Sequence, residues 1–226
     1  MKDSHDIVIR GNYAKDDGEY NIVVHGVDSN RLTHNVTVEN NHCVRGGQAG
    51  QLTAGIVLLF TQDSREQGNV VEGAYGSGIF LNDRESGHGN KVLDNQLTGN
   101  GTHQSTGAIT LEEASKAEVR HNTTNRQGSG GYAFRLEGGP HTRGVRVVDN
   151  VFSPGNGRLM DVAKPALTAL IADYNSYYGP PSGHFRLGDK EYSFAAWKLQ
   201  SKQDEHSRVL DPQDSQFVNA PPGAGR

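Results

Sequence analysis

The sequence of 226 residues contains only one cysteine, Cys43. A single cysteine cannot close an internal disulfide, and without a second cysteine nearby it does not indicate a zinc site. We therefore expect Cys43 to pack as a small apolar side chain in the interior.

Long apolar runs and an excess of positive charge are also missing. Only 34% of the residues are apolar, and no stretch approaches the roughly 20 apolar residues that a membrane helix needs. Lys and Arg number 22 against 26 Asp and Glu, so the net charge of −4 creates no basic field of the kind that attracts nucleic acid. We expect neither a membrane-spanning segment nor a nucleic-acid partner.

The sequence is rich in glycine, with 29 residues, and in short β-type apolar runs that recur. The runs follow one another at intervals of 23 to 34 residues and occupy 21–24, 55–58, 78–81, 108–111, 133–136 and 158–161. A repeat in this range without helical periodicity indicates a solenoid of stacked parallel strands. Alternate side chains point inward in such strands, so the runs supply two stacked apolar columns. Five inward pairs form them: Ile22/Val24, Ile56/Leu58, Ile79/Leu81, Ile109/Leu111 and Phe134/Leu136.

Each repeat contains a second short apolar segment, which is followed by a polar residue that is usually asparagine. The column contains Asn12, Asn41, Asn95, Asn122 and Asn150, with Gly73 and Tyr174 as exceptions. Val70 is the apolar residue that leads into Gly73. An asparagine tolerates the left-handed conformation at a sharp corner, and its amide can bond to the next coil. The pattern predicts two strands and a turn in each repeat.

The clearest repeat is Gly78-Ile79-Phe80-Leu81 followed by Asn90-Lys91-Val92-Leu93-Asp94-Asn95. It resembles the repeats of the right-handed parallel β-helix in the pectate-lyase-like superfamily, and the resemblance covers residues 7–178. The fold it implies is all-β, a right-handed parallel β-helix of about seven coils.

The remaining residues resemble the closing segment of bacterial secreted β-helix proteins. We therefore divide the chain into a β-helix over 1–178 and a C-terminal capping segment over 179–226. Phe194 and Trp197 lie three residues apart in the only plausible amphipathic helix of the chain, so the capping segment is predicted to contain one short helix. Such a cover protects the open end of a solenoid from aggregation.

The start of the chain has neither an amphipathic cap nor the features of a secretory signal. Strand-like residues begin at Ile7. We expect a fragment of a longer β-helix, from a protein secreted to the extracellular space or the periplasm, and we expect it to be a monomer.

Polar residues gather on the outward side of the first strand column. Outward positions in the middle repeats are taken by Asn82, Glu112, Arg135 and Glu137, with Arg84, Asp83 and Glu113 beside them. His25 takes the corresponding position in the first repeat, and Met160 and Val162 are placed outward in the sixth. Neighbouring repeats lie about 5 Å apart, so these side chains are predicted to form one cluster.

Three chemistries fit the cluster. Carboxylates about 5 to 5.5 Å apart suit a retaining glycosidase, with Glu112 and Glu137 as acid and nucleophile. Alternatively, the carboxylates could bind Ca²⁺, with Asp83 and Glu113 as the candidate metal ligands, and the ion would neutralise the carboxyl group of a uronate. The resemblance then implies that an arginine, Arg135 or Arg84, removes a proton as in pectate-lyase-like enzymes.

His25, Asn82 and Arg84 are the candidate substrate-binding residues, and a histidine, His25 or His88, is a third candidate for the base. The sequence therefore favours a carbohydrate-active protein that acts on an acidic polysaccharide, either as a lyase or as a hydrolase. The predicted catalytic residues are Glu112, Arg135 and Glu137. The alternative is a binding or structural module in which the same charges form a solvated ion-pair ladder. The adjacent residues of Asp204-Glu205-His206-Ser207 do not deliver the geometry of a catalytic triad, so we interpret them as a structural turn in the cap.

Overall fold

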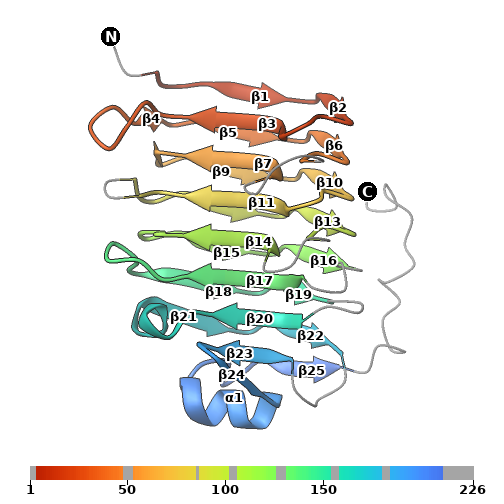
Figure 1. The fold of residues 1–226 in the computed structure, drawn as a ribbon, viewed down its shortest axis with the longest axis vertical. Coiled ribbons are helices and arrows are strands. Elements are labelled where there is room, and N and C mark those ends of the chain that lie inside the picture. Colours follow the sequence, from red (N-terminus) through yellow and green to blue (C-terminus); the bar gives the residue numbers. More distant parts are fainter. Residues whose placement is uncertain are drawn as a thin grey trace.

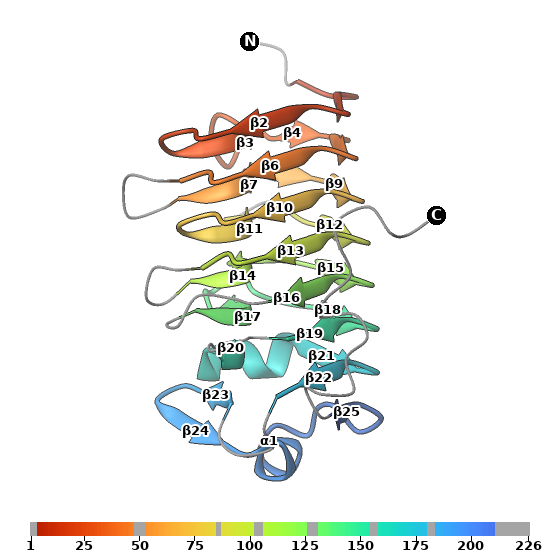
Figure 2. The ribbon, with the colours of Figure 1, turned by 90° about the vertical axis from the view of Figure 1, so that its right-hand side faces the viewer.

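The computed structural model describes residues 4–47, 53–84, 87–101, 106–125, 131–153, 158–179 and 184–210. The chain winds into a long prism whose faces are three parallel sheets, and a short helix lies at the C-terminal end (Figures 1 and 2). The predicted all-β parallel β-helix is confirmed. Sheets of seven and eight strands agree with the expectation of about seven coils.

Each long sheet takes one strand from successive coils. Sheet 1 contains β3 (Tyr20–His25), β7 (Ala54–Leu59), β11 (Ser77–Asn82), β14 (Gly107–Glu112), β17 (Tyr132–Glu137), β20 (Arg158–Val162), β23 (Phe185–Leu187) and the antiparallel β24 (Lys190–Tyr192). Sheet 2 contains β1 (Val8–Arg10), β5 (Thr37–Glu39), β9 (Arg65–Gln67), β12 (Lys91–Leu93), β15 (Glu118–Arg120), β18 (Val145–Val148) and β21 (Leu170–Asp173). Sheet 3 contains β2 (Tyr13–Lys15), β6 (His42–Val44), β10 (Val70–Glu72), β13 (Gln96–Thr98), β16 (Thr123–Asn125), β19 (Val151–Phe152), β22 (Ser176–Tyr178) and β25 (Arg208–Leu210). The short strands β4 (Thr33–His34) and β8 (Thr61–Gln62) pair at one corner, and the helices are the 3₁₀ helix η1 (Lys164–Ala169) and the α-helix α1 (Phe194–Ser201).

Each coil carries three strands rather than the predicted two, because the chain passes through sheets 1, 2 and 3 in turn. The strands of sheet 3 are at most three residues long. Their middle residues, such as Cys43, Val71 and Leu97, are buried in the core. A single inward residue leaves no alternation in the sequence, so the pattern could not reveal this sheet.

The core columns of sheet 1 stack in register as predicted up to the fifth strand, with Ile79 between Ile56 and Ile109. The sixth strand differs. Met160 pairs with Phe134 and Val162 pairs with Leu136, so both are buried inside rather than facing outward. A shift of one residue turns each side chain to the other face of a sheet. The outward position of β20 therefore belongs to Asp161, which pairs with Arg135.

The asparagine column forms an unbroken ladder of seven residues. Its members are Asn12, Asn41, Asn69, Asn95, Asn122, Asn150 and Asn175. At each step the backbone N–H and the side-chain Nδ2 both donate to the Oδ1 of the next asparagine, over 2.9–3.1 Å. Asn69 and Asn175 take the places that we had given to Gly73 and Tyr174. The left-handed conformation belongs to the preceding residue, as at Asp94 (φ 55°) and Tyr174 (φ 57°).

The place in sheet 2 that Val70 was predicted to fill is occupied by Glu66. Val70 itself lies in β10 of sheet 3. Glu66 pairs with Val38 on one side and Val92 on the other, and it is fully buried in this valine column. Glu66 is a charged residue type at a core position, so it interrupts the apolar pattern of sheet 2. For this reason the sequence predicted the strand at the wrong place.

The capping segment closes the C-terminal end as expected. The side chain of Ser193 caps α1 by accepting a bond from the Ala196 N–H, and Trp197 is buried against the last coil. Trp197 Nε1 donates to Asp204 Oδ2 over 2.8 Å, and Asp204 Oδ1 also accepts from Asn175 at the end of the ladder. Neither helix of the described residues is long and apolar enough to cross a membrane.

Candidate functional site

The outward side of sheet 1 brings most of the predicted site residues together. Asn82, Glu112 and Glu137 are paired in register on β11, β14 and β17. A parallel row beside them contains Arg135 and Asp161. Neighbouring strands lie about 4.8 Å apart, so the functional groups of adjacent strands are within reach of one another.

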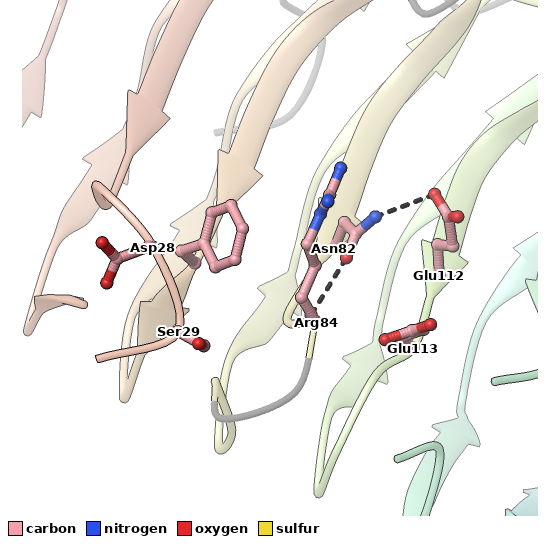
Figure 3. A pocket seen from close by; sticks show the side chains of 7 residues that line it. Asp28, Ser29, Asn82, Arg84, Glu112 and Glu113 are labelled. Atoms are coloured by element: carbon pink, nitrogen blue, oxygen red, sulfur yellow. Dashed lines mark hydrogen bonds between the residues drawn. The ribbon is translucent and has the colours of Figure 1, made fainter. Parts of the chain in front are cut away.

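A groove of about 380 Å³ opens where sheet 1 turns the corner. Asp28, Ser29, Phe60, Asn82, Arg84, Glu112 and Glu113 line it. Phe60, Arg84 and Glu113 each follow a strand of sheet 1 with left-handed backbone, at φ values of 50°, 46° and 48°. The corner conformation directs the chain out of the sheet, and Figure 3 shows Arg84, Glu112 and Glu113 gathered on one side of the groove.

Glu112 lies at the centre of this arrangement. Asn82 Nδ2 donates to Glu112 Oε2 over 2.8 Å, and Asn82 Oδ1 in turn accepts from the Arg84 N–H over 3.0 Å (Figure 3). Burial raises the pKa of Glu112, and the charge of Glu137 raises it further, against the opposing effects of Asn82 and Arg84. Both main causes favour the protonated carboxyl group.

Glu137 has a different environment, because it forms an ion pair with Arg135. Arg135 Nη1 lies 2.9 Å from Glu137 Oε1, while Arg135 Nε lies 3.2 Å from Asp161 Oδ2. Asp161 exposes only 9% of its side chain, and burial raises its pKa even though Arg135 and Arg186 oppose this. Asp161 was not among the predicted site residues, because the predicted strand was displaced by one residue from β20.

A second hollow, of about 400 Å³, adjoins these charges toward the C-terminal end. It is lined by Arg135, Leu136, Glu137, Gly138, Asp161, Ala163, Lys164, Pro165, Arg186, Gly188 and Asp189. Arg186 Nη1 donates to the hydroxyl of Tyr132 over 3.0 Å and lies 3.9 Å from Asp161 Oδ2. The polar surface therefore continues from the groove over Glu137 onto β23.

Arg135 and Glu137 line the second hollow rather than the groove, and two further predicted residues line neither. His25 is exposed on β3, and its ring contacts Phe60 edge-on at 5.5 Å between centroids. Asp83 is fully buried: its Oδ1 accepts from Asn90 Nδ2 over 2.6 Å, and its Oδ2 accepts from the Ser115 N–H over 2.8 Å. Burial raises its pKa to about 6. Asp83 thus joins successive coils internally, and of the predicted metal ligands only Glu113 lines the groove.

The Asp204 to Ser207 run is part of the closed end. Asp204 is buried, and its Oδ1 accepts from the hydroxyls of Ser207 and Tyr177 over 2.6 and 2.9 Å. His206 Nδ1 instead lies 2.7 Å from Asp173 Oδ2 on the surface. The histidine therefore has a separate partner from the serine, and the geometry is that of a structural turn.

The family comparison agrees with the fold. Residues 1–157 match the family model described as a right handed beta helix region. No curated protein and no solved structure matches the chain. The fold is used by carbohydrate-active proteins and by structural solenoids, so it defines a broad class of functions only. The match covers more than half of the sequence, and the chain belongs to the right-handed β-helix family.

Proposed function

We propose that the protein hydrolyses an acidic polysaccharide outside the cell, with Glu112 as the general acid and Glu137 as the nucleophile. The observation that carries the proposal is that these two carboxyl groups are paired on adjacent strands but have different surroundings, since burial raises the pKa of Glu112 whereas Glu137 forms an ion pair with Arg135. Two titratable groups whose surroundings favour different protonation states are the signature of an acid and base pair.

The geometry indicates how the two groups share the reaction. Glu112 is half-buried and keeps its proton more readily, so it can protonate the leaving oxygen of the glycosidic bond. Glu137 is ion-paired with Arg135 on the neighbouring outward position of the same strand and is placed to attack the sugar. The strand spacing of about 4.8 Å is near the separation of carboxyl groups in retaining enzymes, which form a covalent glycosyl intermediate.

Substrate binding falls to the groove beside the pair. The guanidinium carbon of Arg84 lies 5.1 Å from the centre of the Phe60 ring, which holds the cation at the rim of the groove. A cation at this place is suited to the carboxylate of a uronic acid. Asn82 links the backbone of Arg84 to Glu112 and so connects the binding residue to the acid.

The arrangement favours hydrolysis over elimination. Arg135 contacts carboxylates on two sides, and a guanidinium held in two ion pairs balances charge rather than accepting a proton. The described residues contain no group of three or more His, Cys, Asp or Glu side chains placed to hold a metal ion. Because Asp83 is occupied inside the coil, the predicted calcium ligands do not converge, and we derive no step through calcium.

The test is a panel of uronate polysaccharides incubated with the wild-type protein, with calcium or with a chelator. Hydrolysis predicts new reducing ends without absorbance from unsaturated products, at equal rates in both conditions. Glu137→Gln should lower the rate by roughly a thousandfold, the scale of losing a principal catalytic group. Lys190→Gln, an exposed residue of the cap, is the control and should keep the wild-type rate.

A polysaccharide-binding module without turnover is the second candidate. It is favoured by the chain of charges from Glu137 through Arg135 to Asp161, since an ion-pair ladder stands without any catalytic role. Binding to the panel without any product would select this candidate, and unsaturated products would select a lyase.

A further inference from the structure

Five cations lie together on the outer face of sheet 2 and on the corner that leads into it, away from the groove on sheet 1. This basic strip consists of Arg65, Lys91, Lys116, Arg143 and Arg146, and all five side chains are exposed. Arg65, Lys91 and Arg146 lie on β9, β12 and β18, which follow one another along the length of the molecule with β15 between the last two (Figure 2).

The register places three of the cations in one row of sheet 2, with an acid between the second and the third. Arg65 pairs with Lys91, and one strand further Glu118 pairs with Lys91 and with Arg146. Lys116 and Arg143 lie at the adjoining corner, where the Lys116 N–H donates to the Arg143 carbonyl over 2.7 Å. Neighbouring strands are about 4.8 Å apart, so Arg65 and Lys91 present adjacent positive charges and Arg146 lies two strands beyond Lys91.

Carboxylates do not balance the strip. Glu118 is the single acid in its row, and its Oε2 reaches Lys91 Nζ only at 4.0 Å. Within the described part of the chain, Arg65, Lys116, Arg143 and Arg146 form no ion pair. The acids at the two edges have other contacts: Asp63 accepts from Gln62 at one edge, and Asp94 and Asp149 lie beside His121 at the other.

The clustering of positive charge in the basic strip does not stabilise the fold. Like charges directly opposite one another on neighbouring strands are destabilising, as at Arg65 and Lys91. The chain as a whole has a net charge of −4, so a local excess of cations is not a result of general composition. Sheet 1 shows the contrast, because there Arg135 is paired on both sides.

We propose that the basic strip binds an anionic polysaccharide strand through its carboxylate or sulfate groups, as a non-catalytic site separate from the groove. An extended polymer with charges at regular intervals complements cations spaced by the strands. Single-stranded nucleic acid also needs aromatic side chains for base stacking. The outward residues of β9, β12, β15 and β18 include no aromatic side chain. The proposal does not depend on the hydrolytic activity.

The test compares two triple variants of the full chain with equal changes in net charge. The strip variant is Arg65→Gln, Lys91→Gln and Arg146→Gln, and the control variant is Lys15→Gln, Lys190→Gln and Lys202→Gln at exposed positions elsewhere. Affinity is measured at low salt for polygalacturonate, dextran sulfate, neutral dextran and an oligothymidylate. Arg84→Gln is added to separate binding in the groove from binding on the strip, and circular dichroism confirms the fold of each variant.

The wild-type protein should bind at least one of the two anionic polysaccharides and not neutral dextran, with affinity that falls as salt rises. The strip variant should bind about tenfold more weakly, and it should show the same loss when Arg84→Gln is present in both proteins compared, whereas the control variant should stay within about twofold. The preferred polymer distinguishes carboxylate from sulfate recognition. Equal losses in the strip and control variants would overturn the proposal, as would an absence of binding to both polymers. Tighter binding of the oligothymidylate through the strip would overturn the assignment to polysaccharide.

Discussion

Glu66 carries a carboxyl group where the neighbouring coils have Val38 and Val92. The side chain is fully buried, and neither carboxyl oxygen has a hydrogen-bond partner. Burial raises the pKa of Glu66 well above its usual range and also raises that of the nearby Cys43 thiol, to about 12. Burial therefore favours the neutral form of both groups in the folded protein.

The consequence is a loss of stability at high pH. A carboxyl group with a raised folded pKa contributes stability below its unfolded pKa of about 4.3, and this contribution is lost as the pH rises toward the folded pKa. Glu66→Leu should raise the free energy of unfolding by roughly 1–3 kcal/mol at neutral pH, because an unpaired buried polar group is removed. Urea denaturation at pH 5 and pH 9 should show a larger gain at pH 9. Glu118→Gln, at a partly exposed position of β15, is the control, and a gain that does not grow with pH would contradict the explanation.

Glu112 responds to two neighbours of opposite sign. The charge of Glu137 raises its pKa and the charge of Arg84 lowers it. Glu137→Gln should therefore lower the pKa of Glu112, whereas Arg84→Gln should raise it. Carboxyl titration by NMR measures both shifts without any substrate, and shifts in the same direction would show that the electrostatic account of the acid is mistaken.

At the scale of elements, the asparagine ladder joins the coils at one corner. Asn122 accepts two bonds from Asn95 and donates two to Asn150, all of them buried. Asn12 is exposed at the end of the ladder and only donates to Asn41. An asparagine in the middle of the ladder should therefore contribute more to the free energy of unfolding than one at its end.

Truncation to alanine measures this difference. Asn122→Ala leaves two buried donors of Asn95 without an acceptor and should cost roughly 2–4 kcal/mol of unfolding free energy. Asn12→Ala should cost less than about 1 kcal/mol, because the backbone N–H of residue 12 still donates to Asn41 Oδ1 and the lost side chain is exposed. Thermal or urea unfolding of the two variants checks the ranking, and equal losses would mean that the ladder does not carry the stability assigned to it.

The cap depends on Asp204, which accepts bonds from Trp197, Tyr177, Ser207 and Asn175. Asp204→Ala should detach α1 and uncover the last strands of the solenoid, an edge that promotes aggregation. Trp197 is the only tryptophan, so its fluorescence reports on the cap alone. The variant should show a red-shifted emission at temperatures where the circular dichroism of the sheets is unchanged. Simultaneous changes in both signals would instead indicate one cooperative unit.

At the scale of the whole molecule, the sequence predicted the solenoid because a long strand with two inward residues leaves a visible alternation. Sheet 3 was missed because its short strands turn one residue inward, as at Cys43. The ladder was predicted at five of its positions, and Asn69 was displaced because the buried Glu66 hid the preceding strand. Asp161 was missed through the one-residue shift of β20. The predicted cluster around Glu112 was found because outward positions of neighbouring strands meet whenever the register is correct.

The proposed catalytic pair, Glu112 and Glu137, lies on the outer face of a solenoid that is otherwise repetitive. A retaining mechanism requires that Glu137 form a bond to the sugar, and that Glu112 then assist water in breaking it. When Glu112 can no longer act as acid or base, a substrate with a good leaving group still forms the glycosyl intermediate. The hydrolysis of this intermediate is then slow, so it accumulates.

The most direct measurement is therefore the intact mass of Glu112→Gln after incubation with an aryl glycoside of the uronic acid released from the panel. The account predicts an added mass of one glycosyl unit, which peptide mapping places on Glu137. A folded variant that carries no adduct, or an adduct on another residue, would contradict the assignment of Glu137 as the nucleophile.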